Sequence, residues 1–189
     1  SFGQTRFNIL MLGVVHDGVA YPLLWKMLDK KGNSNSEERM DLLDRFEEIF
    51  PNIQVAYISG DREFVGKQWL TYLLIEPTIS FRLRIRHSDQ ISDGKKQLRA
   101  SIIFANLKPG QTQTLSGRRW VWGRLVYVSA LRLDDGELLI IITPEATTSA
   151  ISDYAQRWGI ETLFGIFKTR GFCLESTHFT DSERLSKLL

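Results

Sequence analysis

The sequence predicts one α/β domain, for three reasons. Short apolar runs rich in β-branched residues alternate with helical patterns, strand-like runs crowd the middle of the chain, and a helical pattern of about 20 residues follows them. At 189 residues the chain has the size of one domain that carries an insertion. With 43% hydrophobic and 24% charged residues, its composition disfavours long disorder, and its early apolar run is too short for a membrane-spanning helix. The single cysteine, Cys173, excludes an internal disulfide.

A β-hairpin is predicted at the start of the chain. Residues 7–15 and 19–25 are apolar runs, and Asp17 and Gly18 between them are a strong turn signal. Pro22 has no amide hydrogen to donate to a ladder, so we expect the second strand to lie at a sheet edge.

A helix, a buried strand and a second helix are predicted next. Ser36 is a suitable N-cap for a helix that Pro51 ends, residues 53–59 are strand-like, and residues 62–75 have helical periodicity. Asp61 falls at the junction of this strand and the second helix, where open α/β sheets place their chemistry. The alternative is that Asp61 only caps the helix.

The strand that follows has an arginine face. Residues 79–86 alternate apolar side chains with serine and arginine, which is typical of a half-buried strand. The sequence predicts further strands at residues 101–107, 119–133 and 138–143.

This middle part of the chain is strongly basic. Residues 81–132 hold 11 basic and 2 acidic side chains, a net charge of +9, whereas the rest of the chain is acidic. Such a partition indicates a surface that faces a polyanion, although a solvated sheet is the alternative. Aromatic residues among these cations, including Trp120 and Trp122, either stack on unpaired bases or fill a small β core.

A long helix is predicted from about residue 150 to residue 170, where Gly171 ends it. At about 100° per residue, four polar side chains share one narrow stripe beside the apolar face of this helix. They are Tyr154, Arg157, Glu161 and Lys168. The alternative is a solvated helix face with ordinary ion pairs between neighbouring turns.

The spacing of these four residues resembles the Tyr-Arg-Glu-Lys signature of bacterial insertion-sequence transposases with a DDE catalytic triad. Residues 61–64, followed by Gly66, resemble the block that holds the second catalytic aspartate of that class. The loop at residues 32–39 and the strand at residues 132–140 are also similar to it. The resemblance covers essentially the whole chain.

The resemblance implies a ribonuclease H-like fold, in which a mixed sheet is flanked by helices and an antiparallel β-rich insertion precedes the catalytic helix. We expect residues 1–86 to form the first part of the core, residues 87–143 the basic insertion, and residues 144–189 the part with the catalytic helix.

The resemblance also implies a DNA transposase that cuts and joins DNA by two-metal phosphoryl transfer, with Mg²⁺ or Mn²⁺ as the ions. By this resemblance Asp61 and Glu161 are catalytic and bind the metal ions. The expected DNA-binding residues are Tyr154, Arg157, Lys168, Arg118, Arg119, Trp120 and Trp122. The expected partners are double-stranded DNA with terminal inverted repeats, target DNA and a second copy of the protein, in the bacterial cytoplasm at the nucleoid.

The sequence departs from the family at the first aspartate of the triad, which is not visible. The chain starts inside the link that follows the first, central strand, so we expect a truncated core that lacks this strand and is inactive alone. Asp17 is expected to be a turn residue far from the site and not a replacement. Two alternatives stay open: a noncatalytic nucleic-acid-binding domain, and a hydrolytic ribonuclease H-like nuclease.

Overall fold

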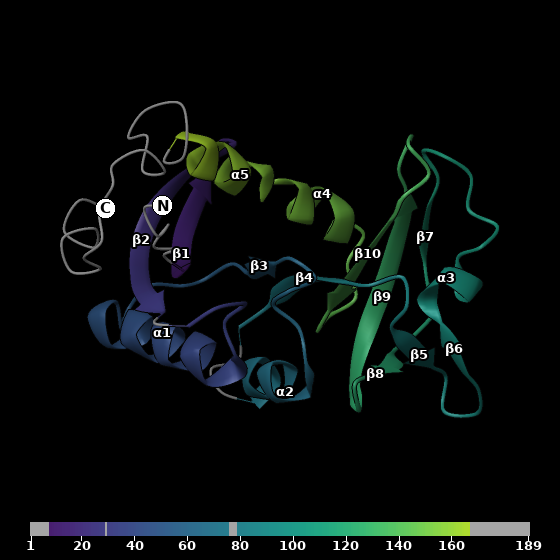
Figure 1. Ribbon diagram of the computed structural model, residues 1–189. Coiled ribbons are helices and arrows are strands. Elements are labelled where there is room, and N and C mark those ends of the chain that lie inside the picture. The colour runs from purple at the N-terminus through teal and green to yellow at the C-terminus, as the bar shows by residue number, and fades with distance from the viewer. Residues whose placement is uncertain (1–7, 29, 76–78, 167–189) are drawn as a thin grey trace, which may run out of the picture. The chain divides into compact units, whose positions relative to one another are not determined.

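The computed structural model describes residues 8–28, 30–75 and 79–166, with the helices and strands labelled in Figure 1. The chain forms two compact units. The first unit consists of residues 1–51 and 156–189, and the second of residues 52–155. None of the described helices combines the length and the apolar composition that crossing a bilayer requires.

The first unit contains the predicted hairpin. Strands β1 (Asn8–His16) and β2 (Val19–Leu28) pair antiparallel. Asp17 and Gly18 both have positive φ, at 49° and 76°, which matches the right-handed twist of a two-residue hairpin turn. The register shifts at Gly13, which lies opposite Pro22. Asp17 is the turn residue that the sequence predicts. The expectation that it lies far from the predicted site is wrong, because the neighbouring Gly18 is in close contact with Gly159, two residues before Glu161.

Helix α1 spans Ser36–Ile49, and its N-cap is Asn35. With Ser36 as the N-cap, the helix would begin one residue later. The Asn35 side chain accepts a hydrogen bond from the Glu38 amide at 2.9 Å, and the Glu38 carboxylate accepts one from the Asn35 amide at 2.8 Å. This reciprocal capping box satisfies two amides at the start of the helix. The prediction of Ser36 as the cap is wrong, since both residue types cap helices well and only the geometry separates them.

Helix α5 (Trp158–Gly165) packs on the hairpin of the first unit. Leu163 and Ala20 form a small buried cluster there, with Met11, Val15 and Ile160 around it. Gly159 approaches the hairpin so closely that a Cβ atom at this position would lie 2.8 Å from the carbonyl oxygen of Gly18.

The second unit is built on a mixed sheet. Its strand order is β3, β4, β10, β9, β8, β5, β6, and β7 pairs with β9 beside this path. β3 and β4 are parallel, and the other pairs are antiparallel. The strands are β3 (Ile58–Gly60), β4 (Phe81–Ile85), β5 (Gln90–Ser92), β6 (Gln97–Arg99), β7 (Thr112–Thr114), β8 (Arg119–Val121), β9 (Arg124–Arg132) and β10 (Leu138–Thr143). The helices of this unit are α2 (Lys67–Ile75), α3 (Ala100–Ile103) and α4 (Ala150–Ala155).

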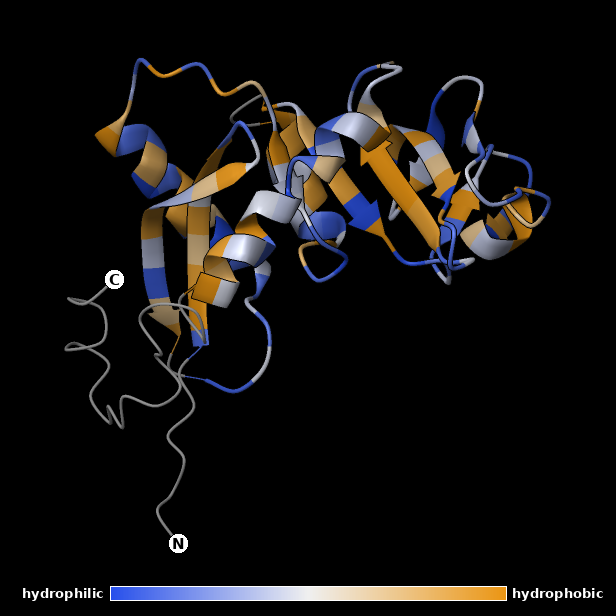
Figure 2. Ribbon diagram, turned by 90° about the horizontal axis from the view of Figure 1, so that it is seen from above, coloured by the Kyte–Doolittle hydropathy of each residue, from blue (hydrophilic) through white to orange (hydrophobic). Residues whose placement is uncertain are grey.

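The centre of this sheet is apolar. Every residue of β10 is buried, and Figure 2 shows this strand and its neighbour β9 as largely hydrophobic. β10 lies between β4 and β9. The chain that leaves the sheet at the end of β4 therefore re-enters it as β10, the neighbour of β4. The residues between β4 and β10 are rich in strands, and they lie within or next to the segment 87–143 that the sequence predicts as an insertion, which also includes β10.

Two strand predictions inside this segment are wrong. Residues 101–107 contain most of α3 and a turn, because one helical turn is too short to show its periodicity in the sequence. Residues 119–133 form two strands, β8 and β9, and not one. Trp122 and Gly123 between them have φ of 47° and 74°, so the chain reverses in a tight two-residue turn.

Candidate active site

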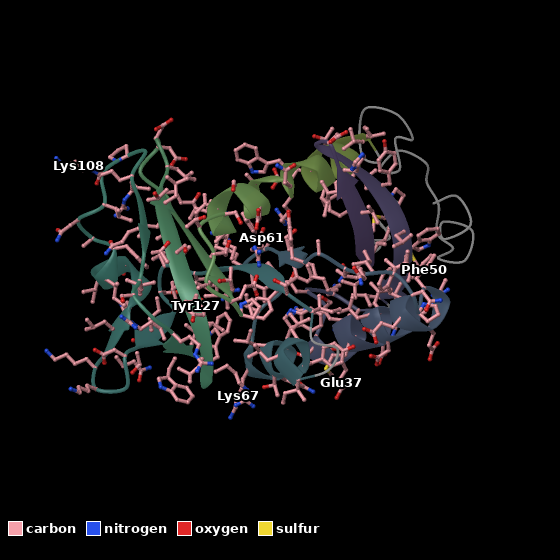
Figure 3. All side chains as sticks on the ribbon, turned by 180° about the vertical axis from the view of Figure 1, so that it is seen from behind. Glu37, Phe50, Asp61, Lys67, Lys108 and Tyr127 are labelled. Carbon is pink, nitrogen blue, oxygen red and sulfur yellow. The ribbon has the colours of Figure 1, made fainter. Side chains whose placement is uncertain are left out.

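Asp61 follows β3 directly and lies in the second unit (Figure 3). The amide of Arg62 donates to its carboxylate at 2.7 Å, and the amide of Phe64 donates to its carbonyl oxygen at 2.7 Å, so a turn fixes the residue. α2 begins only at Lys67, six positions further on. Asp61 therefore does not cap this helix, and the simpler of the two interpretations of the sequence is wrong.

Gly60, the residue before Asp61, is tightly packed against Leu83 and Phe64. A Cβ atom at Gly60 would lie 2.9 Å from a methyl carbon of Leu83 and 3.0 Å from the Cβ of Phe64. Gly60 is buried, and β3 pairs parallel with β4 at Gly60 and Leu83. Position 60 has no room for a side chain, so a glycine is required where β3 ends and Asp61 follows.

Tyr154 lies beside Asp61 in the second unit. Its phenol oxygen is 3.5 Å from a carboxylate oxygen of Asp61, although 93 positions separate the two residues in the sequence. Tyr154 is 4% exposed and packs with Leu139, Ile141 and Ala150. The structure thus brings together one predicted metal ligand and one residue of the predicted signature.

Arg157 and Glu161 lie in the first unit, because the predicted long helix is broken between α4 and α5. At the break the amide of Ile160 donates to the Arg157 carbonyl oxygen, three residues back, as in a 3₁₀ turn. The Arg157 guanidinium is 3.2 Å from the Glu161 carboxylate, and the Glu161 side chain is 63% exposed. Lys168 lies outside the described residues.

Carboxylate oxygens of the kind that Asp61 and Glu161 supply are the hard ligands that Mg²⁺ prefers. In the described part of the chain, no three histidine, cysteine or acidic residues gather in a group that would hold a metal ion. The donor chemistry of the two residues fits a divalent cation that keeps several water ligands.

The basic segment exposes some of its predicted DNA-binding residues. Arg118 is exposed, and Arg119 on β8 donates to its carbonyl oxygen at 3.0 Å. Trp120 is 44% exposed, whereas Phe104 is fully buried, so Phe104 fills the β core and Trp120 does not. Trp122 is half-buried in the turn between β8 and β9.

Sequence reasoning missed a buried ion cluster around Arg82 on β4. The Arg82 side chain is 8% exposed and pairs with Asp153 at 2.8 Å and with Glu145 at 2.7 Å. In the sequence, Arg82 is one of three arginines with the same alternation on this strand. Nothing in that pattern distinguishes it from Arg84 and Arg86.

Comparisons with known proteins agree with this picture. A family model described as a transposase DDE domain matches residues 3–189. A comparison with curated protein sequences finds no match. Among solved structures, the chain is similar to the piggyBac transposase of a synaptic complex with hairpin DNA, with a TM-score of 0.50 and 14% identity. The similarity covers 86% of this chain and 34% of that transposase, and it confirms the predicted ribonuclease H-like α/β fold.

Proposed function

Because this chain belongs to the transposase DDE domain family, we propose that it forms the catalytic core of a transposase that cuts and joins DNA at transposon ends. The observation that carries the proposal is the pairing of Tyr154 with Asp61, at 3.5 Å. A signature residue and an acidic residue from distant parts of the sequence meet in one place.

In this proposal Asp61 and Glu161 bind Mg²⁺ or Mn²⁺ as two of the carboxylate ligands of a two-ion site. Divalent ions in such a site activate the attacking oxygen and stabilise the leaving one. The exposed Glu161 carboxylate is accessible to an ion from solvent, and Arg157 beside it balances its charge. Tyr154, Arg157 and Lys168 are the proposed DNA-binding residues. The guanidinium fork and the ammonium charge suit the phosphates of the transposon end. Tyr154 is 4% exposed and acts from beside Asp61.

The proposal also assigns a role to each segment of the chain. Residues 1–86 and 144–189 form the ribonuclease H-like core, and residues 87–143 form the basic insertion. The exposed side chains of Arg118 and Trp120 support a DNA-facing role for the insertion. Arg119 also binds DNA there, and Trp120 or Trp122 receives a base displaced from the duplex near the cut.

The proposed partners are double-stranded DNA with terminal inverted repeats, a target DNA, and a second copy of the protein on the DNA. The structural neighbour is a transposase in a synaptic complex with hairpin DNA, which supports a DNA partner for this chain. We place the reaction in the bacterial cytoplasm at the nucleoid, where such DNA is found.

A strand-transfer assay tests the proposed function. The chain, extended upstream by about 20 residues, which is the length of a short strand with its linker, is mixed with pre-cut transposon ends and target DNA in Mg²⁺. We expect joined products. Hydrolysis without joining would identify a nuclease, and DNA binding without any cutting would identify a noncatalytic binding domain.

Two variants separate the roles of the signature residues in that assay. Glu161→Gln should abolish cutting and joining while end binding is retained, because the amide keeps the shape but loses the charge that holds the ion. Lys168→Ala should weaken end binding. A Glu161→Gln protein that still joins DNA would remove this residue from the site.

A further inference from the structure

Arg82 sits at the centre of a buried polar network in the second unit. Its Nε atom donates to the Asp153 carboxylate at 2.8 Å, and its Nη1 atom donates to the Glu145 carboxylate at 2.7 Å. Nη1 also donates to the Ser80 hydroxyl and to the carbonyl oxygen of Phe81. The guanidinium lies 4.9 Å from the centre of the Tyr57 ring. These contacts together fix the position and the orientation of the Arg82 guanidinium.

Asp153 is the point at which this network reaches α4. Besides Arg82, its carboxylate accepts a hydrogen bond from the Ser149 hydroxyl at 2.9 Å. Its carbonyl oxygen accepts one from the Tyr57 hydroxyl at 3.3 Å. Asp153 immediately precedes Tyr154, so these contacts hold the backbone next to the phenol that lies beside Asp61.

α4 depends on such contacts because it is short. It has six residues, and an isolated helix of this length is unstable in water. Apolar packing of Tyr154 and Ala150 fixes its distance from the sheet. The ion pairs from Arg82 add direction, since a guanidinium fork donates its hydrogen bonds in its own plane.

The charge of Arg82 is secured by the same contacts. Burial lowers the pKa of a guanidinium, but the hydrogen bonds to Asp153 and Glu145 outweigh this and raise the pKa of Arg82 above its usual range. A buried ion pair contributes little net stability compared with apolar packing, and its best-supported use is to specify one arrangement. Arg84 on β4 and Arg86 just after it lack this environment, since Arg84 pairs with Glu137 and Arg86 with Glu63 nearer to solvent.

We propose that Arg82 is a positioning residue that, through Asp153, orients the phenol of Tyr154 toward the carboxylate of Asp61. The geometry concerns this chain alone, and its importance for DNA chemistry rests on the proposed function. A test of the position of the phenol therefore gives a result that does not depend on the result of a transposition assay.

The test follows the Tyr154 ring by ¹⁹F NMR in the 189-residue chain labelled with 3-fluorotyrosine. The chain has five tyrosines, and the Tyr154→Phe variant identifies the resonance of Tyr154. Replacing Asp61 by asparagine removes the charge beside the phenol and shifts this resonance. The size of that shift measures how close the ring and the carboxylate are.

In an Arg82→Gln background, we expect the shift caused by Asp61→Asn to fall below about half of its original size, as coupled residues require in a double-mutant cycle. Arg82→Lys, which keeps the charge but not the fork, should retain an intermediate share. Arg124→Gln is the matched control, since Arg124 bridges a strand to a different helix by donating to Thr71 at 2.8 Å, and it should retain the full shift.

An undiminished Asp61→Asn shift in the Arg82→Gln protein would overturn the proposal. If Arg82→Gln does not fold, as judged by circular dichroism, Asp153→Asn replaces it and must reduce the shift in the same way. A full shift in folded Asp153→Asn protein would then overturn the proposal equally.

Discussion

Helix α4 carries Tyr154 and helix α5 carries Glu161, two residues of one sequence signature, but different forces hold the two helices in place. α4 is fixed by buried ion pairs and hydrogen bonds that converge on Asp153. α5 is fixed by apolar packing at Leu163 and by close backbone contact at Gly159. Polar contacts set the direction of Tyr154, whereas packing from one side leaves Glu161 on the exposed face. A phenol that faces one carboxylate needs orientation, and a carboxylate that is proposed to bind a metal ion needs access to solvent.

The largest effect that this comparison predicts is at Gly159. A valine there would drive side-chain carbons into the hairpin carbonyl of Gly18, which lies 2.8 Å from the position of a Cβ atom. We expect Gly159→Val to lower the free energy of unfolding by about 2–4 kcal/mol. Urea unfolding measures this, and hydrogen exchange should locate the loss of protection in α5 and the hairpin and not in α4.

Gly165→Ala is the control for this prediction. Gly165 lies in the same helix, and a Cβ atom there would meet nothing within 4 Å. Alanine should stabilise α5 by about 0.5–1 kcal/mol, because it has the higher helix propensity. Equal loss of stability in both glycine variants would show that Gly159 is not a contact point.

The next effect is expected at Asp153, in α4. Asp153→Asn leaves the buried Arg82 with one carboxylate in place of two, and we expect a loss of about 1–3 kcal/mol in the free energy of unfolding. Glu145→Gln should cost less than about 1 kcal/mol, since Glu145 is about half exposed and exposed ion pairs are weak. The reverse order would mean that Asp153 is not the anchor of α4.

A smaller effect is expected at the capping box of α1, in the first unit. Asn35→Ala removes the side-chain acceptor for the Glu38 amide and should cost about 1 kcal/mol. Thermal unfolding measures this, and Ser36→Ala is the control, because Ser36 is inside the helix and is not its cap. A larger loss of stability in Ser36→Ala than in Asn35→Ala would show that Ser36 is the N-cap, as the sequence predicts.

The smallest effect is a pH dependence at Tyr57. Burial, together with the charge of Asp153, raises the pKa of Tyr57 above its ordinary value of 10.0. The neutral phenol is therefore favoured by folding, and this contribution is complete below pH 10.0 and is lost as the pH rises through the raised pKa. Ultraviolet titration should show tyrosine absorbance that changes late, and Tyr57→Phe should reduce this late change.

The parts of the fold that the sequence predicts well are those in which local chemistry and burial agree. The Asp17-Gly18 turn and the apolar strand at residues 138–143 are two such cases. Both come from patterns that one element or one turn fully determines.

The parts that the sequence misses depend on contacts between elements. The helix expected from residue 150 to residue 170 is broken after α4, although its residues keep helical periodicity on both sides. The burial of Arg82 depends on Glu145 and Asp153, which are more than 60 positions away. No pattern within one strand contains this information.

The central proposal is that Asp61 and Glu161 hold the same divalent ions, and iron-mediated cleavage of the polypeptide tests it most directly. Fe²⁺ takes the place of Mg²⁺ in the upstream-extended chain, and ascorbate with peroxide then produces hydroxyl radicals at the bound ion. We predict cuts near residue 61 and near residue 161, both of which disappear in Asp61→Asn and in Glu161→Gln. Absence of cuts near either residue, or cuts at one residue that survive replacement of the other, would contradict a shared site.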